Sequence, residues 1–226
     1  MTGWENYFAK FCDGTYRYKN RDVVKLPDNL PMPPTTDMRD IFGYCQQLQD
    51  ISALAGWDTS KVTSMSCIFH HCSQLKDTSA LANWNVSNVT YMQSMFFECE
   101  QLQDITALAN WDVSNVKNMS YIFCHCHQLR DISGIAKWNT SKVTAMRDMF
   151  YNCELLKDIS ALANWDIGNV TDMSEMFWNC FELTSLDISK WDTGNVIYMR
   201  GMFNNCHRLP ELAQTNPREY IKTLAQ

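Results

Sequence analysis

The sequence predicts a solenoid, which is a stack of short coils built from one repeated unit. The pattern Met-x-x-[Met/Ile]-Phe-x-x-Cys-x-x-Leu occurs seven times in 226 residues, and its cysteine returns every 27 residues until the last interval, which is 26. One tryptophan follows the same period. The repeated cysteines are Cys45, Cys72, Cys99, Cys126, Cys153, Cys180 and Cys206. The repeated tryptophans are Trp57, Trp84, Trp111, Trp138, Trp165 and Trp191.

Each coil is expected to contain four pieces, which the coil after Cys153 illustrates. Residues 156–162 read Leu-Lys-Asp-Ile-Ser-Ala-Leu, which predicts a short strand with alternate residues facing inward. Residues 163–169 are rich in Asn, Asp and Gly and predict a turn. Residues 170–173 predict a second extended piece, and residues 174–177 predict a helical turn that places Met and Phe in the core.

The two ends of the chain are expected to differ from the coils. We assign residues 1–37 to an N-terminal cap helix and linker, 38–209 to a solenoid of about 6.5 repeats of 26–27 residues, and 210–226 to a C-terminal cap helix. Asn216 and Pro217 form a typical helix start. Caps are expected because the open apolar end of a solenoid needs a cover. For the first helix, packing on a partner protein is the alternative.

The two repeated residue types are expected to be structural ladders. A row of cysteines flanked by core residues is typical of buried thiols that act as small hydrophobic side chains. Seven thiols in one row cannot all form disulfides. Three further cysteines, Cys12, Cys67 and Cys124, lie outside the row, and the sequence does not assign their redox state. The tryptophans are expected to be core residues rather than a sugar-binding or cofactor-binding surface.

The repeat resembles that of the BspA-like leucine-rich-repeat surface proteins, whose coil has the form Leu-Asp-Ile-Ser-x-Trp-Asp-Thr-Ser-Asn-Val-Thr-x-Met-x-x-Met-Phe-x-x-Cys. Residues 164–180 and 186–196 carry the resemblance, which covers about three quarters of the chain and recurs in every coil. It implies a leucine-rich-repeat-like, right-handed α/β solenoid of short parallel strands and short helical turns. It also implies a bacterial surface or secreted protein that binds other proteins.

Composition and charge argue against several classes of partner. The net charge is −6, and the Lys and Arg residues are scattered, so nucleic acid and anionic membrane surfaces are not expected partners. No apolar run is long enough to insert into a membrane. Residues 1–6 do not resemble a secretory signal. The location is therefore left between the cell surface or secretion, which the resemblance implies, and the cytoplasm.

Two clusters of histidine and cysteine invite a metal or catalytic assignment. They are His70-His71-Cys72 and Cys124-His125-Cys126-His127. Zinc needs four converging ligands, and the repeated cysteine of each cluster is expected to face the core. A Cys-His catalytic pair needs a third orienting group, which the sequence does not supply. We therefore expect no enzyme, no metal and no cofactor, with a metal or thiol site near Cys124 as a minor alternative.

The candidate functional surface is the outward side of the predicted strand. It carries two polar rows that could meet a protein partner on a concave face. The acidic row is Asp50, Asp77, Asp104, Asp131 and Asp158. The hydroxyl row is Ser52, Ser79, Thr106, Ser133 and Ser160. The alternative is that these aspartates bond to backbone or to neighbouring Lys and Arg residues within the repeat.

The sequence thus predicts a non-enzymatic scaffold for protein–protein interaction, acting through this concave face as a monomer. A structural or adhesive module without one discrete site is the alternative. The sequence does not identify the partner.

Overall fold

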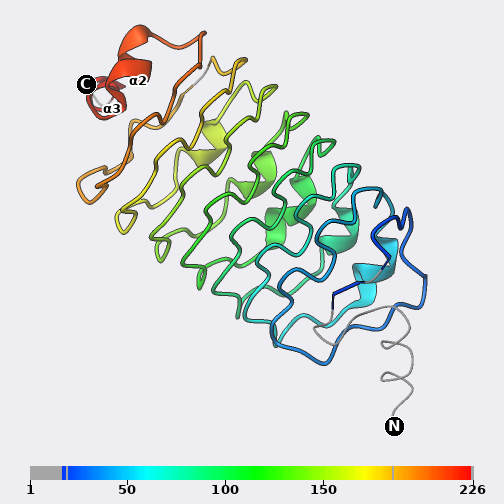
Figure 1. Ribbon diagram of the computed structural model, residues 1–226. Coiled ribbons are helices and arrows are strands. Elements are labelled where there is room, and N and C mark those ends of the chain that lie inside the picture. Colours follow the sequence, from blue (N-terminus) through cyan, green and yellow to red (C-terminus); the bar gives the residue numbers. More distant parts are fainter. Residues whose placement is uncertain (1–16, 19, 185, 225–226) are drawn as a thin grey trace.

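The computed structural model describes residues 17–224 except 19 and 185. Figure 1 shows an elongated stack of similar coils, in which successive coils follow one another from the N-terminal to the C-terminal end. Within the described residues, no helix combines the length and apolar character needed to cross a bilayer.

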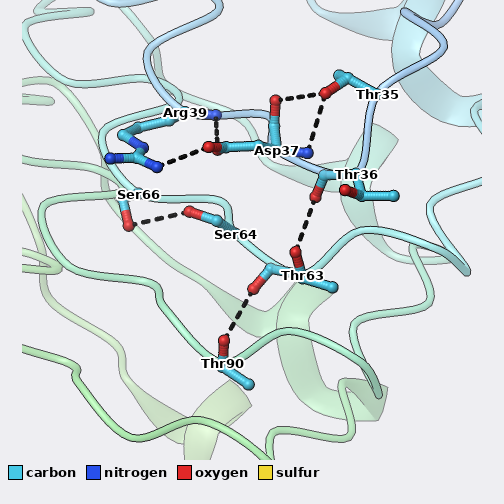
Figure 2. Close-up of polar contacts among 8 residues, drawn as sticks. All are labelled: Thr35, Thr36, Asp37, Arg39, Thr63, Ser64, Ser66 and Thr90. Carbon is cyan, nitrogen blue, oxygen red and sulfur yellow. Dashed lines mark hydrogen bonds and ion pairs between the residues drawn. The ribbon is translucent and has the colours of Figure 1, made fainter.

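Parallel backbone contacts fix the register between neighbouring coils. Isolated parallel bridges connect one position per coil along the whole stack: Asp37, Ser64, Tyr91, Asn118, Ala145, Asp172 and Tyr198. Beside this position, the Thr63 hydroxyl donates to the Thr36 carbonyl oxygen at 3.2 Å and the Thr90 hydroxyl to the Thr63 carbonyl oxygen at 3.1 Å (Figure 2). The strand-like ladder therefore follows the Val-Thr-x-Met piece of each coil.

The segment between this ladder and the repeated cysteine has an unusual backbone. Alternate N–H groups donate to the next coil, as in the bonds from Met65, Cys67, Phe69 and His71, which are 2.7 to 3.0 Å long. Two positions per coil, four residues apart, have positive φ; in one coil they are Cys67 and His71, both at 58°. The left-handed residues occur at the same two positions in each coil and change the direction of the chain there. The alternate N–H groups nevertheless remain hydrogen-bonded to the neighbouring coil.

Three interior ladders account for the repeated residues. Buried phenylalanines stack from coil to coil with ring centroids 5.5 to 5.7 Å apart, from Phe42 to Phe203. Each tryptophan from Trp57 to Trp191 donates its indole N–H to a carbonyl oxygen of the preceding coil at 2.9 to 3.1 Å. From Cys72 onward, each repeated thiol donates to the carbonyl oxygen of the preceding coil's phenylalanine at 3.0 to 3.3 Å.

The cysteine row therefore joins packing to hydrogen bonding. A thiol is small enough to fit between closely spaced coils, and its S–H donates a hydrogen bond to a carbonyl oxygen. A methyl group at the same place would remove that hydrogen bond. All seven thiols of the row are free and buried, as is Cys124, and Cys67 is free and half-buried. Cys12 lies outside the described residues.

The predicted strand at residues 156–162 is extended only at its start, where the equivalent aspartates Asp104 and Asp131 of two other coils form an isolated parallel bridge. Short 3-10 helices occupy the rest of this part of the coil. They are η1 (Ser52–Gly56), η2 (Ser79–Leu81), η3 (Thr106–Asn110), η4 (Ser133–Ile135) and η5 (Ser160–Leu162). The Asp158 carboxylate accepts the N–H of Ser160 at 2.9 Å, which bends the chain into a turn instead of an extended strand.

The predicted helical turn at residues 174–177 is wrong. Glu175 has a φ of 58°, which does not belong to a right-handed helix. Among the described residues, parallel pairing is limited to isolated bridges, so the expectation of mostly short parallel strands is corrected to coils of turns and 3-10 helices held by regular hydrogen bonds between neighbours.

The ends of the described chain pack on the coils. Lys25 forms a parallel bridge with Asp50, and the indole N–H of Trp57 donates to Leu30, so the segment before residue 38 lies along the first coil. The predicted first helix lies outside the described residues. At the other end are α2 (Glu211–Thr215) and α3 (Pro217–Leu224). The side chain of Arg218 in α3 donates to two carbonyl oxygens of the last coil.

Candidate functional site

The predicted acidic row is present, but each aspartate serves its own coil. The carboxylates of Asp50, Asp77, Asp104, Asp131 and Asp158 each accept the backbone N–H two residues ahead, at 2.7 to 3.2 Å. The hydroxyl groups of Ser79, Thr106 and Ser160 also donate to the aspartate of their coil, at 2.8 to 2.9 Å. Aspartate and hydroxyl side chains therefore form a local turn, the arrangement known as an Asx turn.

The acidic row remains open to solvent in spite of these bonds. Asp77, Asp104, Asp131 and Asp158 are exposed, and Asp50 is half-buried. Within the described residues, the row has a single ion pair, between Lys25 and Asp50 at 3.8 Å. The local bonds explain why the aspartate is the same in the five coils that carry this row, and they leave its outer side available.

The two histidine and cysteine clusters do not converge on a point. Cys72 and Cys126 direct their thiols to carbonyl oxygens in the core. His71 lies 2.6 Å from the Glu98 carboxylate, and His127 lies 3.2 Å from that of Glu154. In the described part of the chain, no group of three or more His, Cys, Asp and Glu side chains is arranged to hold a metal ion.

Burial makes the thiols of the row poor nucleophiles. It raises the pKa of Cys45 to about 11 and that of Cys206 to about 12. The pKa of Cys124 is also raised by burial, with Asp148 and Glu98 adding to the effect. A reactive cysteine requires the opposite shift.

A second surface lies beside the cysteine row, and sequence reasoning did not single it out. We call it the turn face and define it by the two residues before each repeated cysteine. Its residues are Gly43, Tyr44, His70, His71, Phe97, Glu98, Cys124, His125, Tyr151, Asn152, Trp178, Asn179, Asn204 and Asn205. In all seven coils the second residue of each pair is left-handed, with φ between 58° and 62°.

Aromatic rings form an unbroken row along the turn face. Tyr44 stacks on His71 at a centroid distance of 4.5 Å, and the row continues through contacts of 5.3 to 6.1 Å. Its later members are Phe97, His125, Tyr151 and Trp178. The rings are partly exposed: Tyr44 is 51% exposed, and the other five are half-buried. The row spans six coils with rings held in place by their neighbours.

An amide ladder fixes one ring of this row. Asn205 donates to Asn179 and Asn179 donates to Asn152, both at 2.6 Å. The Asn152 amide nitrogen lies 3.1 Å from Nδ1 of His125. Since an amide NH₂ can only donate, Nδ1 of His125 accepts and its proton is on Nε2. Burial lowers the pKa of His125, with a smaller contribution from His127, so the neutral ring is favoured.

A pocket of about 250 Å³ lies in the middle of the turn face. The rings of Phe97, Tyr121, His125 and Tyr151 line it together with the carboxylates of Asp148 and Glu175. Arg147 lies at its edge and donates Nε–H to Asp148 at 2.7 Å. The pocket therefore combines aromatic rings with acidic groups contributed by four successive coils.

The turn face was missed because most of its left-handed residues carry no familiar sequence signal. Glycine and asparagine indicate positive φ, whereas Tyr44, His71, Glu98 and His125 do not. A signal was nevertheless present in the aligned coils, since Asn152, Asn179 and Asn205 occupy the same place in three of them. That position could have been assigned to a left-handed turn throughout the array.

Comparisons with known proteins give one family and several solved structures, two of which are described below. A family model described as "Mycoplasma protein of unknown function, DUF285" matches residues 36–134 and 128–218. No curated protein sequence matches the chain. A leucine-rich-repeat protein of T. pallidum is 14% identical, with 91% of this chain and 86% of that chain covered and a TM-score of 0.43. A leucine-rich-repeat protein of Bacteroides ovatus is 15% identical, with coverage of 83% and 66% and a TM-score of 0.21.

Proposed function

The chain belongs to the DUF285 family, and on this premise we propose that it is a non-enzymatic repeat scaffold that binds another protein through its turn face. One observation carries the proposal. The residues of the core and of the Asx turns are nearly constant from coil to coil, whereas the adjacent turn face changes from Tyr to His, Glu and Asn along one row. A recognition surface requires side chains that differ from coil to coil on a backbone that stays the same.

The turn face also has the physical character of an interface. Aromatic residues are enriched at protein interfaces, where a rigid ring buries a large area at a small cost in conformational entropy. Here the rings touch one another and the backbone beneath them is hydrogen-bonded to the neighbouring coil. A surface ordered before binding loses little freedom when a partner arrives.

The Asp–Ser row is the second candidate for the binding face. Its carboxylates are exposed, and Asp104 and Asp131 make few contacts beyond their own turns. Its near identity in every coil suits a uniform partner, such as another repetitive surface, better than a single specific contact. A structural or adhesive module, which depends on the number of coils, is the corresponding alternative function.

For location, we propose the bacterial surface. The resemblance of the repeat to BspA-like surface proteins supports this, and the matching family is described for Mycoplasma. Treatment of intact cells with a protease that cannot enter them tests it. A surface protein is degraded along with known surface markers, and a cytoplasmic protein survives until the cells are lysed.

The binding face can be tested by comparing matched surface variants. Chemical crosslinking of the full chain on its cells of origin, followed by mass spectrometry, identifies the partner. Tyr151→Glu with Trp178→Ala is expected to abolish that crosslink, while Asp104→Lys with Asp131→Lys leaves it intact. The opposite result moves the binding face to the Asp–Ser row. Graded loss on deletion of single coils, with neither pair of substitutions decisive, favours the adhesive module.

A further inference from the structure

We propose that the pocket in the turn face receives a lysine or arginine side chain of the partner protein. This rests on the proposed function, because it names the chemistry of what the turn face recognises. Two independent features of the pocket point to a cation: the faces of its rings and the surplus of carboxylates around it.

The rings give the first argument. Phe97 contacts Tyr121 at 6.5 Å and His125 at 5.7 Å, and His125 contacts Tyr151 at 5.4 Å. These four residues are half-buried, so their rings remain accessible from one side. The face of an aromatic ring carries negative electrostatic potential and attracts ammonium and guanidinium groups. The neutral state of His125 adds to this, since a charged imidazolium at the same place would repel a cation.

The carboxylates give the second argument. Asp148 is only 4% exposed, and its single salt bridge within the described residues is to the adjacent Arg147. Glu175, from the next coil, forms no salt bridge within the described part of the chain, although it lines the same pocket. Burial raises the pKa of Glu175, and repulsion from Asp148 adds to it. A cation beside these two carboxylates would favour the ionised form of both and so oppose this rise in pKa.

Other carboxylates in and near the turn face support the same choice by contrast. Glu98 and Glu154 are already close to the imidazoles of His71 and His127, at 2.6 and 3.2 Å. Glu182 is paired with Arg208 at 2.8 Å. Glu175 differs from them, because it forms no salt bridge within the described residues and only the more distant charges of Arg147 and Arg200 act on it.

Arg147 does not fill the pocket. Its side chain is 46% exposed, and it contacts Asp148 through Nε, with the carboxylate at 2.7 Å. It pairs with Asp148 and forms no salt bridge with Glu175 among the described residues, although its charge favours the ionised form of Glu175. The charge complementarity therefore favours one further cation, and the open shape of the pocket suits a side chain that enters from a partner's surface.

The test uses the full chain, isotopically labelled, and four blocked tripeptides as probes in low salt. The probes are acetyl-Gly-X-Gly-amide with X as Arg, Lys, Gln or Glu. NMR titration is expected to show weak binding of the Arg and Lys probes, with the largest shifts at the rings of His125 and Tyr151. Equal shifts with the Gln probe, larger shifts with the Glu probe, or shifts confined to another surface would overturn the proposal.

Matched variants separate the contribution of the carboxylates from that of the aromatic rings. Glu175→Gln removes an ion pair and Tyr151→Leu removes a cation–π contact, and each is expected to weaken binding of the Arg probe by about two- to fivefold, the range of such contacts at exposed sites. Glu182→Gln, a carboxylate already paired elsewhere, is the control and is expected to leave binding unchanged. Unchanged midpoints of thermal unfolding verify that the variants are folded. Equal affinity of wild type and both pocket variants would overturn the assignment.

The outcome is separable from that of the proposed function. If the crosslinked partner depends on the turn face but the cationic probes do not bind, the scaffold proposal stands and this inference fails. If the cationic probes bind in the pocket while turn-face variants keep the partner, the pocket recognises cations and the scaffold proposal fails for this face.

Discussion

Two adjacent rows of the coil behave in opposite ways. The cysteine row has the same residue seven times, and from Cys72 onward each thiol makes the same contact with the preceding coil. The residue just before each cysteine shares one backbone conformation in all seven coils, yet its side chain is Tyr, His, Glu, His, Asn, Asn and Asn.

The difference shows how a repeat separates stability from recognition. Interior positions such as the repeated cysteine are constant because each side chain packs between two neighbouring coils, so a substitution disturbs contacts with both of them. Turn-face residues also contact neighbouring coils, but they lie at the partly exposed surface and do so through contacts of several kinds, ring on ring in some coils and amide to amide in others. The same left-handed turn can then present different side chains in each coil, and the array carries a changing surface at little cost to its stability.

The largest expected effect separates an interior ring from an exposed one. Trp138→Ala should lower the free energy of unfolding by about 3 to 5 kcal/mol, because it creates a large cavity and removes the indole bond to Leu108. Its ring is stacked between Trp111 and Trp165 at 6.3 Å each. Urea unfolding followed by circular dichroism measures the loss.

Trp178→Ala, in the turn face, is the matched control and should cost much less. Trp178 is half-buried and lies over Gly201, whose φ is 67° and where an added Cβ would come within 2.8 Å of the indole ring. Equal destabilisation by the two tryptophan substitutions would mean that the turn face is a structural part of the core, contrary to the comparison.

A smaller effect is expected for the thiols. Cys126→Ala should destabilise the chain by about 1 to 2 kcal/mol, through loss of the buried sulfur and of its bond to Phe96 at 3.3 Å. Cys67→Ala, at a half-buried thiol outside the row, should be nearly neutral. Differential scanning calorimetry of the two variants compares their stabilities directly. If Cys126→Ala is as stable as the wild type, the thiols of the row do not contribute to the stability of the stack.

The next effect concerns the Asp–Ser row. Asp104→Ala should cost about 0.5 to 1 kcal/mol, since it removes the acceptor of the Thr106 N–H, as loss of a helix cap does. Asp104→Asn should be nearly neutral, because an amide oxygen can accept the same bond. The chain already contains this exchange in another turn, where Asn85 accepts from Ser87 as Asp58 accepts from Ser60.

Chemical denaturation of both variants measures this difference, and the crosslinked partner provides a second readout. Loss of the partner with Asp104→Asn, where the fold is retained, would show that the carboxylate charge itself is used in binding. That result would move recognition from the variable row to the constant one and so reverse the comparison.

The sequence predicted the parts of the fold that depend on side-chain identity. The period, the buried cysteine and tryptophan rows and the start of α3 at Pro217 all follow from residues whose packing or capping role is specific. The length of the predicted strand did not follow, because Leu-x-Asp-Ile-Ser fits both an outward-facing strand and an Asx turn, and only its aspartate position forms parallel bridges. The hydrogen bond from Ser160 to Asp158, which decides between them, depends on the backbone and not on the pattern of apolar residues.

The candidate surface was harder to predict for a related reason. The acidic row attracted attention because it repeats, yet repetition in a solenoid marks what the coils need for themselves. Tyr151 and Glu175 did not stand out, since each occurs once at its place in the coil. Their proximity results from stacking, in which residues from different coils and different positions meet in one pocket.

The smallest expected effect tests the neutral state of His125. Burial lowers its pKa below the ordinary value of 6.5, while His127 disfavours and Glu98, Glu100 and Asp148 favour the charged ring. The unfolded chain therefore takes up a proton before the folded chain does, and stability should fall as the pH drops below about 6.5. His125→Gln should lose less stability than wild type between pH 7.5 and pH 5.5 in urea unfolding. His207→Gln, at an exposed histidine, is the control for the replacement itself. If the His125 variant and the wild type have the same pH dependence, the imidazole of His125 is not held neutral.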